Sequence, residues 1–539
     1  MRLTRIEISN YSRIQDLNLE VRRHAVIVGA NDVGKSSILR MLNLLLGTST
    51  AAIYQALKLS DLRDVEQPLV VNAWWSEFTD TNRRPFPSEI SIADDQVSEY
   101  LWVQMIVEPD PEDDQTVTIR RWFPESGHEK GPSREQLEVF GWRYLKATRG
   151  PSLMEGAHSP VRTLLAAAEL GSNEEALKGL LEQFNEKIAG NESVANLLGR
   201  VAEHLSRSMP RALAKDDFSV RTVTDPSSDV LQDVTMFLNR GGTHIPLIEQ
   251  SDGVRQLMSM TLFDLAEGTA NILAIDEPEI HLHPTSQRTA ADLLSGGGNQ
   301  KIIVTHSPYI LHRFEPEEVI AVDRDGKCHQ VGKTELSKVD KARAHWWSPR
   351  LLEALTARFV VVVEGTADRI IVESVAQHLG VDFDRLGAVV IELDGAEKFK
   401  NVFPLLGPGG FGPTLLGLVD EAESGSWVGA FGGRPRDVID KKVFVSAADL
   451  EDEYTAALGG PAAANALIDG KFCHLQALLQ STGAETIDTI EATAVAKFCR
   501  SKGKVDAATC IAEAMTPDTA KEIGSVARLV SVLRELSSQ

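Results

Sequence analysis

The feature that most constrains the fold is the segment GANDVGKS at residues 29–36, which fits the pattern GxxxxGK[ST]. An apolar run, HAVIV, leads into it, and an apolar-periodic segment follows it as far as Gly47. The pattern therefore predicts a strand, a glycine loop and a helix in succession. Such a loop wraps phosphates with backbone N–H groups at a helix N-terminus, with Lys35 on the β- and γ-phosphates and Ser36 on Mg²⁺. The residues expected to bind the nucleotide are Gly29, Asn31, Gly34, Lys35, Ser36 and Ser37.

A second motif, NILAIDEPEIHLHP at 271–284, reads as an apolar strand that ends in two acids. Asp276 is expected to hold Mg²⁺ through water, and Glu277 is expected to orient or activate the attacking water. The next apolar strand, IIVTHSP, ends at His306, which is placed to sense the γ-phosphate. Together with the glycine loop, these residues predict a site that binds and hydrolyses a nucleoside triphosphate.

At 539 residues the chain is too long for one hydrophobic core, so several domains are expected. Alternating patterns at 2–8, 17–21, 69–78 and 101–122 predict strands, and apolar residues three and four apart predict a helical insertion at about 159–215. A polar connector at 333–350 precedes a fresh series of strands and helices, which implies a second parallel sheet. We therefore predict an α/β protein with an ATPase domain at 1–345, whose insertion is a candidate dimerisation element, a second α/β domain at 356–510 and a helical segment at 511–539.

The second domain opens with FVVVVEGTADR, a buried strand that delivers Glu364 to its C-terminal end. Asp368 follows four residues later, so a helix that starts at the glycine places both carboxylates on one side. Parallel sheets bind ligands outside these strand ends, and oxygen-rich clusters suit Mg²⁺ or Mn²⁺. Acids near later strand ends complete the set of candidates: Asp394, Asp420, Asp449, Glu451 and Glu453.

The segment EQSDGVRQLMSM at 249–260 reads as a small-residue turn that opens an amphipathic helix. Taken with the glycine loop, EPEIHLHP and THSP, it resembles the ABC-type ATPase heads of the SMC and recombination-protein group. The resemblance implies that Ser251 and Gly253 contact the γ-phosphate of a partner's nucleotide. It therefore implies a homodimer or higher homo-oligomer through the ATPase heads, although the turn reads QSDGV where the usual signature is LSGGQ.

The acidic site of the second domain resembles the Toprim domain, whose pattern is a strand-end Glu and a later DxD. Here the DxD reads Asp420-Glu421-Ala422, so Glu421, Glu423, or Asp449 with Glu451 are alternatives for the missing acid. An ABC-like head followed by Toprim is similar to the class 1 nucleases of the overcoming-lysogenization-defect (OLD) family and to the nuclease subunit of the Gabija anti-phage system. The resemblance implies the metal ligands Glu364, Asp368, Asp420, Asp449 and Glu451 beside Ser36 and Asp276 of the ATPase site, and it implies Lys502, or alternatively Lys504, as the cation that stabilises charge on the phosphate.

The implied activity is an ATP-regulated DNA endonuclease that depends on Mg²⁺, Mn²⁺ or Ca²⁺ and acts in anti-phage defence or DNA repair. The catalytic residues would be Glu277, His306, Glu364, Asp420 and Lys502. A helicase-like partner subunit is left open. The alternative is a non-cleaving ATP-dependent DNA clamp with a degenerate Toprim domain. A topoisomerase would need a tyrosine nucleophile, and Tyr454 in LEDEY reads as helical.

The chain has 55 Lys and Arg against 77 Asp and Glu, and its net charge of −22 opposes non-specific DNA binding by the chain as a whole. Bound metal would attract the DNA backbone locally. The four cysteines form no CxxC pair, which indicates neither a zinc site nor a disulfide framework. Because no apolar run approaches the length of a membrane span, we expect a cytoplasmic protein without a membrane partner.

Overall fold

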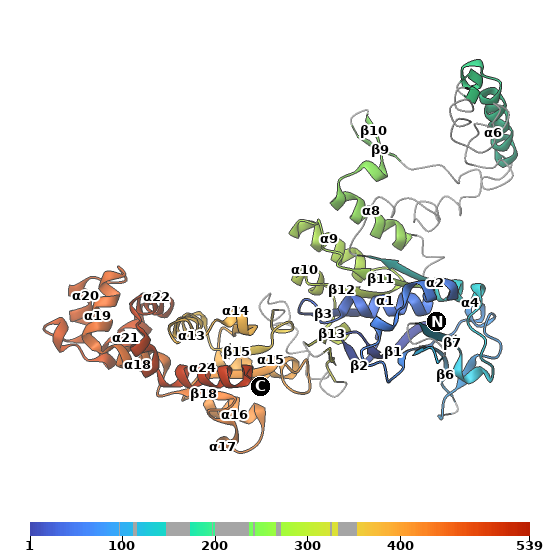
Figure 1. Cartoon of the computed structure of the whole chain (residues 1–539). Helices are drawn as coiled ribbons and strands as arrows, with labels where there is room; N and C mark the ends of the chain where they lie inside the picture. Colours follow the sequence, from blue (N-terminus) through green and yellow to red (C-terminus); the bar gives the residue numbers. More distant parts are fainter. Residues whose placement is uncertain are drawn as a thin grey trace. The chain divides into compact units, whose positions relative to one another are not determined.

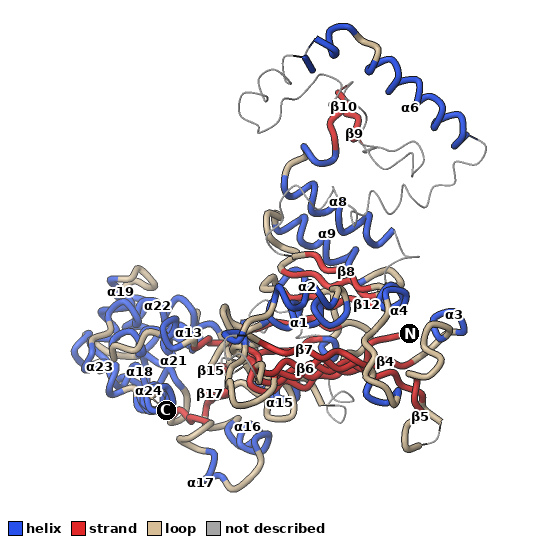
Figure 2. Tube along the Cα trace, turned by 45° about the vertical axis from the view of Figure 1, so that its right-hand side comes forward, coloured by secondary structure: helices blue, strands red, loops and turns tan. Residues whose placement is uncertain are grey.

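The computed structural model describes residues 1–95, 97–111, 116–146, 173–196, 198–199, 237–240, 243–265, 271–323, 326–332 and 353–538. The chain divides into two compact units. The first comprises residues 1–144, 271–279 and 300–539, and the second comprises residues 145–270 and 280–299. Both units mix helices and strands, as Figures 1 and 2 show, so the predicted α/β class is confirmed. Within the described ranges, no helix is long and apolar enough to cross a membrane.

The glycine loop belongs to a six-stranded sheet in the order β14-β13-β3-β12-β11-β8. Its central strands β3, β11, β12 and β13 run parallel and are buried at every position, which explains why their sequences are mostly apolar. The strand bounds are Ala25–Gly29 (β3), Trp142–Leu145 (β8), Ile272–Asp276 (β11), Gln300–Val304 (β12), Val319–Val322 (β13) and Cys328–His329 (β14). The short helix α10 (Pro308–Leu311) follows β12.

A second, antiparallel sheet runs in the order β2-β1-β4-β6-β5, with β7 also paired to β6. Its strands are Arg2–Tyr11 (β1), Ile14–Glu20 (β2), Leu69–Ser76 (β4), Ile90–Ile92 (β5), Glu99–Pro109 (β6) and Val117–Trp122 (β7). Helix α1 (Lys35–Leu46) packs against strands of both sheets, and one hydrophobic cluster joins all three elements. The strands predicted at 2–8, 17–21, 69–78 and 101–122 are confirmed, and helices α2 (Thr50–Ala56), α3 (Asp80–Arg83) and α4 (Arg134–Phe140) complete this part.

The second unit contains the described part of the predicted insertion. Helix α6 (Asn173–Ala189) confirms part of the helical insertion predicted at about 159–215, and most of the other residues of that range lie outside the described ones. A hairpin of β9 (Phe237–Arg240) and β10 (Thr243–Pro246) precedes α8 (Asp252–Leu265), which packs on α9 (Pro284–Ser295). The connector expected at 333–350 also falls outside the described residues.

The predicted second parallel sheet is present, in the order β16-β15-β17-β18. Its strands are Phe359–Val363 (β15), Ala388–Glu392 (β16), Thr414–Asp420 (β17) and Val443–Ser446 (β18). The helices that follow these strands are α13 (Thr366–His378), α14 (Phe383–Leu386), α15 (Phe399–Leu406), α16 (Ser424–Phe431) and α17 (Pro435–Val438). Figures 1 and 2 place α16 and α17 on the opposite side of the sheet from α13.

Seven helices follow the last strand: α18 (Leu450–Leu458), α19 (Gly460–Asp469), α20 (Leu475–Thr482), α21 (Ala492–Lys502), α22 (Lys504–Ala514), α23 (Pro517–Glu522) and α24 (Gly524–Ser537). One hydrophobic cluster runs from Phe359 on β15 to Leu533 on α24. Residues on both sides of the predicted boundary at 510 therefore pack in the same core as the sheet, and this core fixes the ends of the strands where the acids lie.

Candidate functional site

The glycine loop has the backbone that its sequence requires. Gly29 has φ 157°, and a Cβ at this position would lie 2.4 Å from the carbonyl oxygen of Val322, so only glycine fits. Gly34 is the N-cap of α1 with φ 99°, in the left-handed region that favours glycine. These two positions turn the chain from β3 into α1 and leave the helix N-terminus open to an anion. Asn31 is exposed on the loop and Ser37 is half-buried in the first turn of the helix.

Lys35 and Ser36 lie beside the acidic strand β11. Lys35 is only 5% exposed, and its ammonium group donates a hydrogen bond to the Ala30 carbonyl at 2.5 Å. Ser36 Oγ donates to Asp276 Oδ1 at 3.0 Å, and the Tyr144 hydroxyl donates to Asp276 Oδ2 at 3.5 Å. Burial lowers the pKa of Lys35, while Glu277 and Asp276 act in the opposite direction. The structure thus brings a lysine, a hydroxyl and a buried carboxylate together at one end of the parallel sheet.

Glu277 and His306 end neighbouring strands and face each other. Glu277 has φ 48°, unusual for a residue with a side chain, and its N–H donates to Val304 O at 2.8 Å. This backbone brings Glu277 Oε1 to 4.0 Å from His306 Nε2. Burial, followed by the charge of Lys35, lowers the pKa of His306, so its imidazole is held in the neutral form. A neutral imidazole donates a hydrogen bond from one ring nitrogen and accepts one at the other, so His306 could donate to a phosphate oxygen.

One residue of this site was missed by the sequence reasoning, namely Glu279. Its Oε1 accepts from the His306 N–H at 2.6 Å, and its Oε2 accepts from Thr305 Oγ1 at 2.8 Å. Burial raises the pKa of Glu279. Glu279 therefore ties the loop after β11 to the end of β12 and acts as a positioning residue for His306. Its position two residues after Glu277, opposite the hydroxyl-bearing THS, was the available signal.

Ser251 and Gly253, expected to act across a dimer, lie in the second unit at the start of α8. The Ser251 carbonyl accepts from the Arg255 N–H at 2.9 Å, so the turn opens the helix as predicted. A Cβ at Gly253 would lie 2.8 Å from the His281 carbonyl oxygen, which explains the glycine by close packing within this unit.

In the second parallel sheet, Glu364 follows β15 and Asp420 ends β17, its neighbour. The Asp420 N–H donates to Glu364 Oε1 at 3.1 Å. Asp368, in the first turn of α13, accepts from the Gly365 N–H at 2.9 Å. The structure thus brings Glu364, Asp368 and Asp420 to one edge of the sheet. Asp394, after the outer strand β16, is exposed.

Burial and mutual repulsion raise the pKa values of these three acids. The pKa of Asp420 rises to about 8, first because of burial and then because Glu364, Asp368 and Glu451 face it. The pKa of Asp368 rises to about 6, mainly through burial, and that of Glu364 also rises for the same reason. Like charges held this close in a partly buried site are an arrangement that a divalent cation stabilises.

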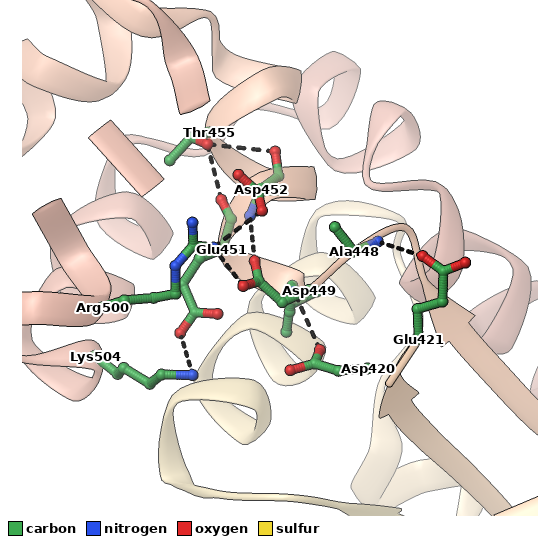
Figure 3. Close-up of polar contacts among 10 residues, drawn as sticks. Asp420, Glu421, Ala448, Asp449, Glu451, Asp452, Thr455, Arg500 and Lys504 are labelled. Atoms are coloured by element: carbon green, nitrogen blue, oxygen red, sulfur yellow. Dashed lines mark hydrogen bonds and ion pairs between the residues drawn. The ribbon is translucent and has the colours of Figure 1, made fainter. Parts of the chain in front are cut away.

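Asp449 and Glu451, at the start of α18, pair with two basic residues from α21 and α22 (Figure 3). Arg500 Nη1 pairs with Asp449 Oδ2 and, at 3.0 Å, with Asp452 Oδ2. Lys504 Nζ pairs with Glu451 Oε1 at 3.0 Å, and Glu451 is only 2% exposed. Asp420 Oδ1 accepts from the Leu450 N–H at 3.1 Å, which joins the strand end to this helix.

Of the two lysines considered for the acidic site, Lys504 is the one whose charge acts on Glu364 and Asp368 as well as on Glu451. Lys502, the predicted residue, lines a pocket with Phe472, Phe498 and Asp506 instead. The reason is that α21 ends at Lys502 and α22 begins at Lys504, so the intervening turn points the two side chains in different directions.

Glu421, an alternative for the missing second acid of DxD, and Glu453, one of the other candidate acids, have structural partners. Glu421 Oε2 accepts from the Ala448 N–H at 3.4 Å (Figure 3). Glu453 accepts from the Ala447 N–H at 2.8 Å and from Ser525 Oγ at 2.7 Å. These bonds occupy Glu421 and Glu453 in fixing the loop before α18, whereas the charge of Glu423 contributes to the raised pKa of Glu364. Tyr454 lies in helix α18 as predicted and is only 2% exposed. A topoisomerase nucleophile must be accessible to DNA, and Tyr454 is not.

Among the described residues, no group of three or more His, Cys, Asp or Glu side chains is arranged to hold a metal ion. The ion pairs explain this, because Asp449 and Glu451 are turned toward Arg500 and Lys504. The donor chemistry of the cluster nevertheless fits a hard divalent cation, since it consists of carboxylates whose charged forms repel one another. Glu364, Asp368 and Asp420 are the residues that would hold such an ion.

Residues 25–312, more than half of the chain, match the family model described as "AAA domain, putative AbiEii toxin, Type IV TA system". Residues 355–420 match "Overcoming lysogenization defect protein-like, TOPRIM domain". The chain is similar to Endonuclease GajA of Bacillus cereus (strain VD045), with 20% identity over 431 residues that cover 73% of this chain and 71% of that protein. It is also similar to the Old nuclease of Escherichia phage P2, with 22% identity over 480 residues that cover 78% of this chain and 77% of that protein.

Two solved structures are also similar to parts of the chain. The C-terminal region of the Burkholderia pseudomallei OLD protein covers 34% of this chain and 98% of its own, with 21% identity and a TM-score of 0.28. An Smc head bound to the C-winged helix domain of ScpA covers 61% of this chain and 96% of its own, with 16% identity and a TM-score of 0.36. By the two family matches, the chain belongs to the AAA-domain family just described, and its ATPase domain is followed by an OLD-like Toprim domain.

Proposed function

We propose that this protein is an ATP-regulated, divalent-metal-dependent DNA endonuclease that acts in anti-phage defence or DNA repair. The observation that carries the proposal is the cluster of Glu364, Asp368 and Asp420 with Lys504 at the carboxyl ends of β15 and β17. Part of this cluster lies in the segment that matches the OLD-like Toprim model. The relatives whose printed names are endonuclease and nuclease support the same activity.

In this proposal Glu364, Asp368 and Asp420 hold the cation, with Asp449 and Glu451 as further ligands once they turn from Arg500 and Lys504. A bound divalent ion supplies activation of water and stabilisation of the leaving oxygen in phosphodiester cleavage. Lys504, freed from Glu451, would balance the charge that builds up on the phosphate. We propose Lys504 for this role in place of Lys502, because Lys504 pairs with Glu451 and its charge acts on Glu364 and Asp368.

The ATPase site would regulate this cluster. Lys35, Ser36 and Asp276 would bind ATP and Mg²⁺, Glu277 would direct the attacking water, and His306 would sense the γ-phosphate. Gly29, Asn31, Gly34 and Ser37 complete the nucleotide cradle, and Ser251 with Gly253 would reach the nucleotide of a second copy. DNA is the proposed substrate, a homodimer or higher homo-oligomer the proposed assembly, and a helicase-like subunit a further proposed partner.

The proposal is tested by incubating supercoiled plasmid with the full-length protein and Mg²⁺ or Mn²⁺. We expect nicked or linear DNA from the parent, and a loss of about a hundredfold or more for Glu364→Gln and for Asp420→Asn, because each removes a ligand oxygen charge. Asp394→Asn is the matched control, since Asp394 is an exposed strand-end acid outside the cluster. Full nicking by Glu364→Gln would overturn the assignment of the site.

A non-cleaving ATP-dependent clamp is a second candidate, favoured by Ala422 at the second DxD position and by the turned-away side chains of Asp449 and Glu451. The same plasmid assay separates the two functions. A clamp would leave the plasmid supercoiled with either metal and would retain circular DNA better than linear DNA when ATP is present.

A further inference from the structure

The C-terminal helices line an open pocket of about 870 Å³ whose lining includes none of Glu364, Asp368 and Asp420. Its basic and aromatic side chains come from α21 and the loop after α19, whereas α20 and α22 contribute small, polar and acidic residues. The residues that define it are Lys471, Phe472, His474, Phe498, Lys502 and Asp506. The Phe472 and Phe498 rings meet edge to face with their centroids 6.0 Å apart. Within the described part of the chain, the Lys471 and Lys502 ammonium groups have no hydrogen-bond or ion-pair partner.

Lys471 has a backbone conformation that favours glycine. It follows the C-cap of α19 with φ 59°, the Lys471 N–H donates to Ile468 O at 3.0 Å, and the Phe472 N–H donates to Leu467 O at 2.9 Å. This bonding pattern ends a helix on a left-handed residue, which is usually glycine. The chain has its glycine one position earlier, at Gly470, where a Cβ would lie 2.4 Å from Cys510 Sγ. Lys471 therefore holds a left-handed conformation that a glycine would adopt at lower cost.

The charge of this pocket differs from that of another large pocket in the same part of the protein. That second pocket, of about 770 Å³, lies along β16 and α14 and is lined by two arginines against four acids: Glu353, Glu373, Asp382 and Asp384. The pocket at Lys471 has two lysines and a histidine against Asp506 alone. The chain as a whole has a net charge of −22, but the lysines of this pocket would attract a phosphate locally.

The pocket lies next to the basic residues that pair with the acids near the carboxylate cluster. Arg500 and Lys504 reach Asp449 and Glu451 from the end of α21 and the start of α22. Phe498 and Lys502, on the same stretch of chain, line the pocket. Gly503 joins the two helices, and a Cβ there would lie 3.6 Å from the Phe472 ring. A single strand of DNA held beside Lys504 can thus continue past Gly503 to the pocket.

We propose that this pocket binds one nucleotide unit of the DNA strand next to the cleavage site. The ammonium groups of Lys471 and Lys502 contact its phosphates, and the base packs on Phe472. Aromatic stacking and lysine contacts to phosphate are together the usual means of holding a single strand without reading its sequence. This inference rests on the proposed nuclease function and adds a site that sets substrate affinity, apart from the acids that carry out cleavage.

The test uses the full-length protein and the variants Lys471→Gly and Lys502→Ala, singly and together. Arg385→Ala is the matched control, because it removes one positive charge from the acidic pocket of the same part of the protein. Binding of a short fluorescein-labelled single-stranded oligonucleotide is measured by anisotropy at several KCl concentrations, in an Asp420→Asn background that does not cut. We expect each lysine variant to weaken binding about threefold to tenfold and to lower the slope of log affinity against log salt by about 1.

Two further readouts separate binding from folding. Lys471→Gly places a glycine in the left-handed backbone conformation at this position. The melting temperature of this variant should therefore equal or exceed that of the parent, while its DNA affinity falls. In plasmid nicking, the double variant should raise KM and leave kcat within about twofold, as expected when binding is lost equally in ground and transition states.

Parent-like affinity and salt slope in the double variant would overturn the inference, and so would an equal loss in Arg385→Ala. A parent protein that never nicks plasmid would overturn the proposed nuclease instead. The anisotropy measurement tests DNA binding at the pocket in either case, because it does not depend on cleavage.

Discussion

Asp420 is the residue of the acidic site whose pKa is shifted most by its surroundings. Its carboxylate ends a buried strand, accepts a hydrogen bond from α18 and faces four other acids, and its pKa rises to about 8. In the folded, metal-free protein Asp420 therefore keeps a proton at pH values where the unfolded chain, with an ordinary pKa near 3.8, has lost it. The folded state binds more protons between these two values, so the stability contributed by Asp420 is complete below about pH 4 and is lost as the pH rises toward 8.

We predict that Asp420→Asn is more stable than the metal-free parent at pH 8 and that the advantage shrinks toward pH 5, where the parent carboxyl is protonated. A gain of a few degrees in melting temperature is expected, since 1 kcal/mol corresponds to about 2–4 °C for a domain of this size. Thermal melts across this pH range, with Asp394→Asn as control, measure it. Added Mg²⁺ should raise the melting temperature of the parent more than that of the variant. Identical pH profiles for parent and Asp420→Asn would contradict the assigned repulsion.

At the scale of elements, the strands that carry the sites could be predicted because each one is a short apolar run that ends in an acid or a histidine. β11, β12, β15 and β17 place Asp276, His306, Glu364 and Asp420 where the sequence indicates. Side chains fixed by contacts distant in sequence could not be predicted. Glu453 is held by Ser525, and the choice between Lys502 and Lys504 depends on a single turn between α21 and α22. Glu279 was missed because its partners, Thr305 and the His306 N–H, come from another strand.

The turn between α21 and α22 gives a prediction about the two lysines. Lys504→Ala should lower kcat for plasmid nicking by about a hundredfold, the effect of removing a charge that stabilises the transition state. It should also lower the melting temperature, because Glu451 would remain buried without its partner. Lys497→Ala, an exposed lysine on α21, is the control and should match the parent. A larger loss of kcat in Lys502→Ala than in Lys504→Ala would restore the original assignment.

On the scale of the whole molecule, one chain combines a nucleotide site and an acidic site on separate parallel sheets. The proposed coupling predicts that ATP changes the rate of plasmid nicking by the parent and that Lys35→Ala abolishes this change, since Lys35 would hold the β- and γ-phosphates. Nicking with and without ATP measures it. Light scattering after gel filtration measures the expected association. Lys35→Ala should not respond to ATP, whereas Glu277→Gln, which should bind ATP without hydrolysing it, should accumulate the assembled form. Nicking indifferent both to ATP and to Lys35→Ala would contradict the coupling.

The continuous core from Phe359 to Leu533 has a consequence for how such proteins diversify. A sheet whose strand-end acids are oriented by helices far downstream cannot be inherited as the short acidic segment alone. Recombination that replaced only residues 355–420 would separate Glu364 and Asp420 from Arg500 and Lys504, and would leave apolar surface without its cover. The portable unit, for natural exchange as for grafting onto another ATPase, is the whole block from 353 to 538.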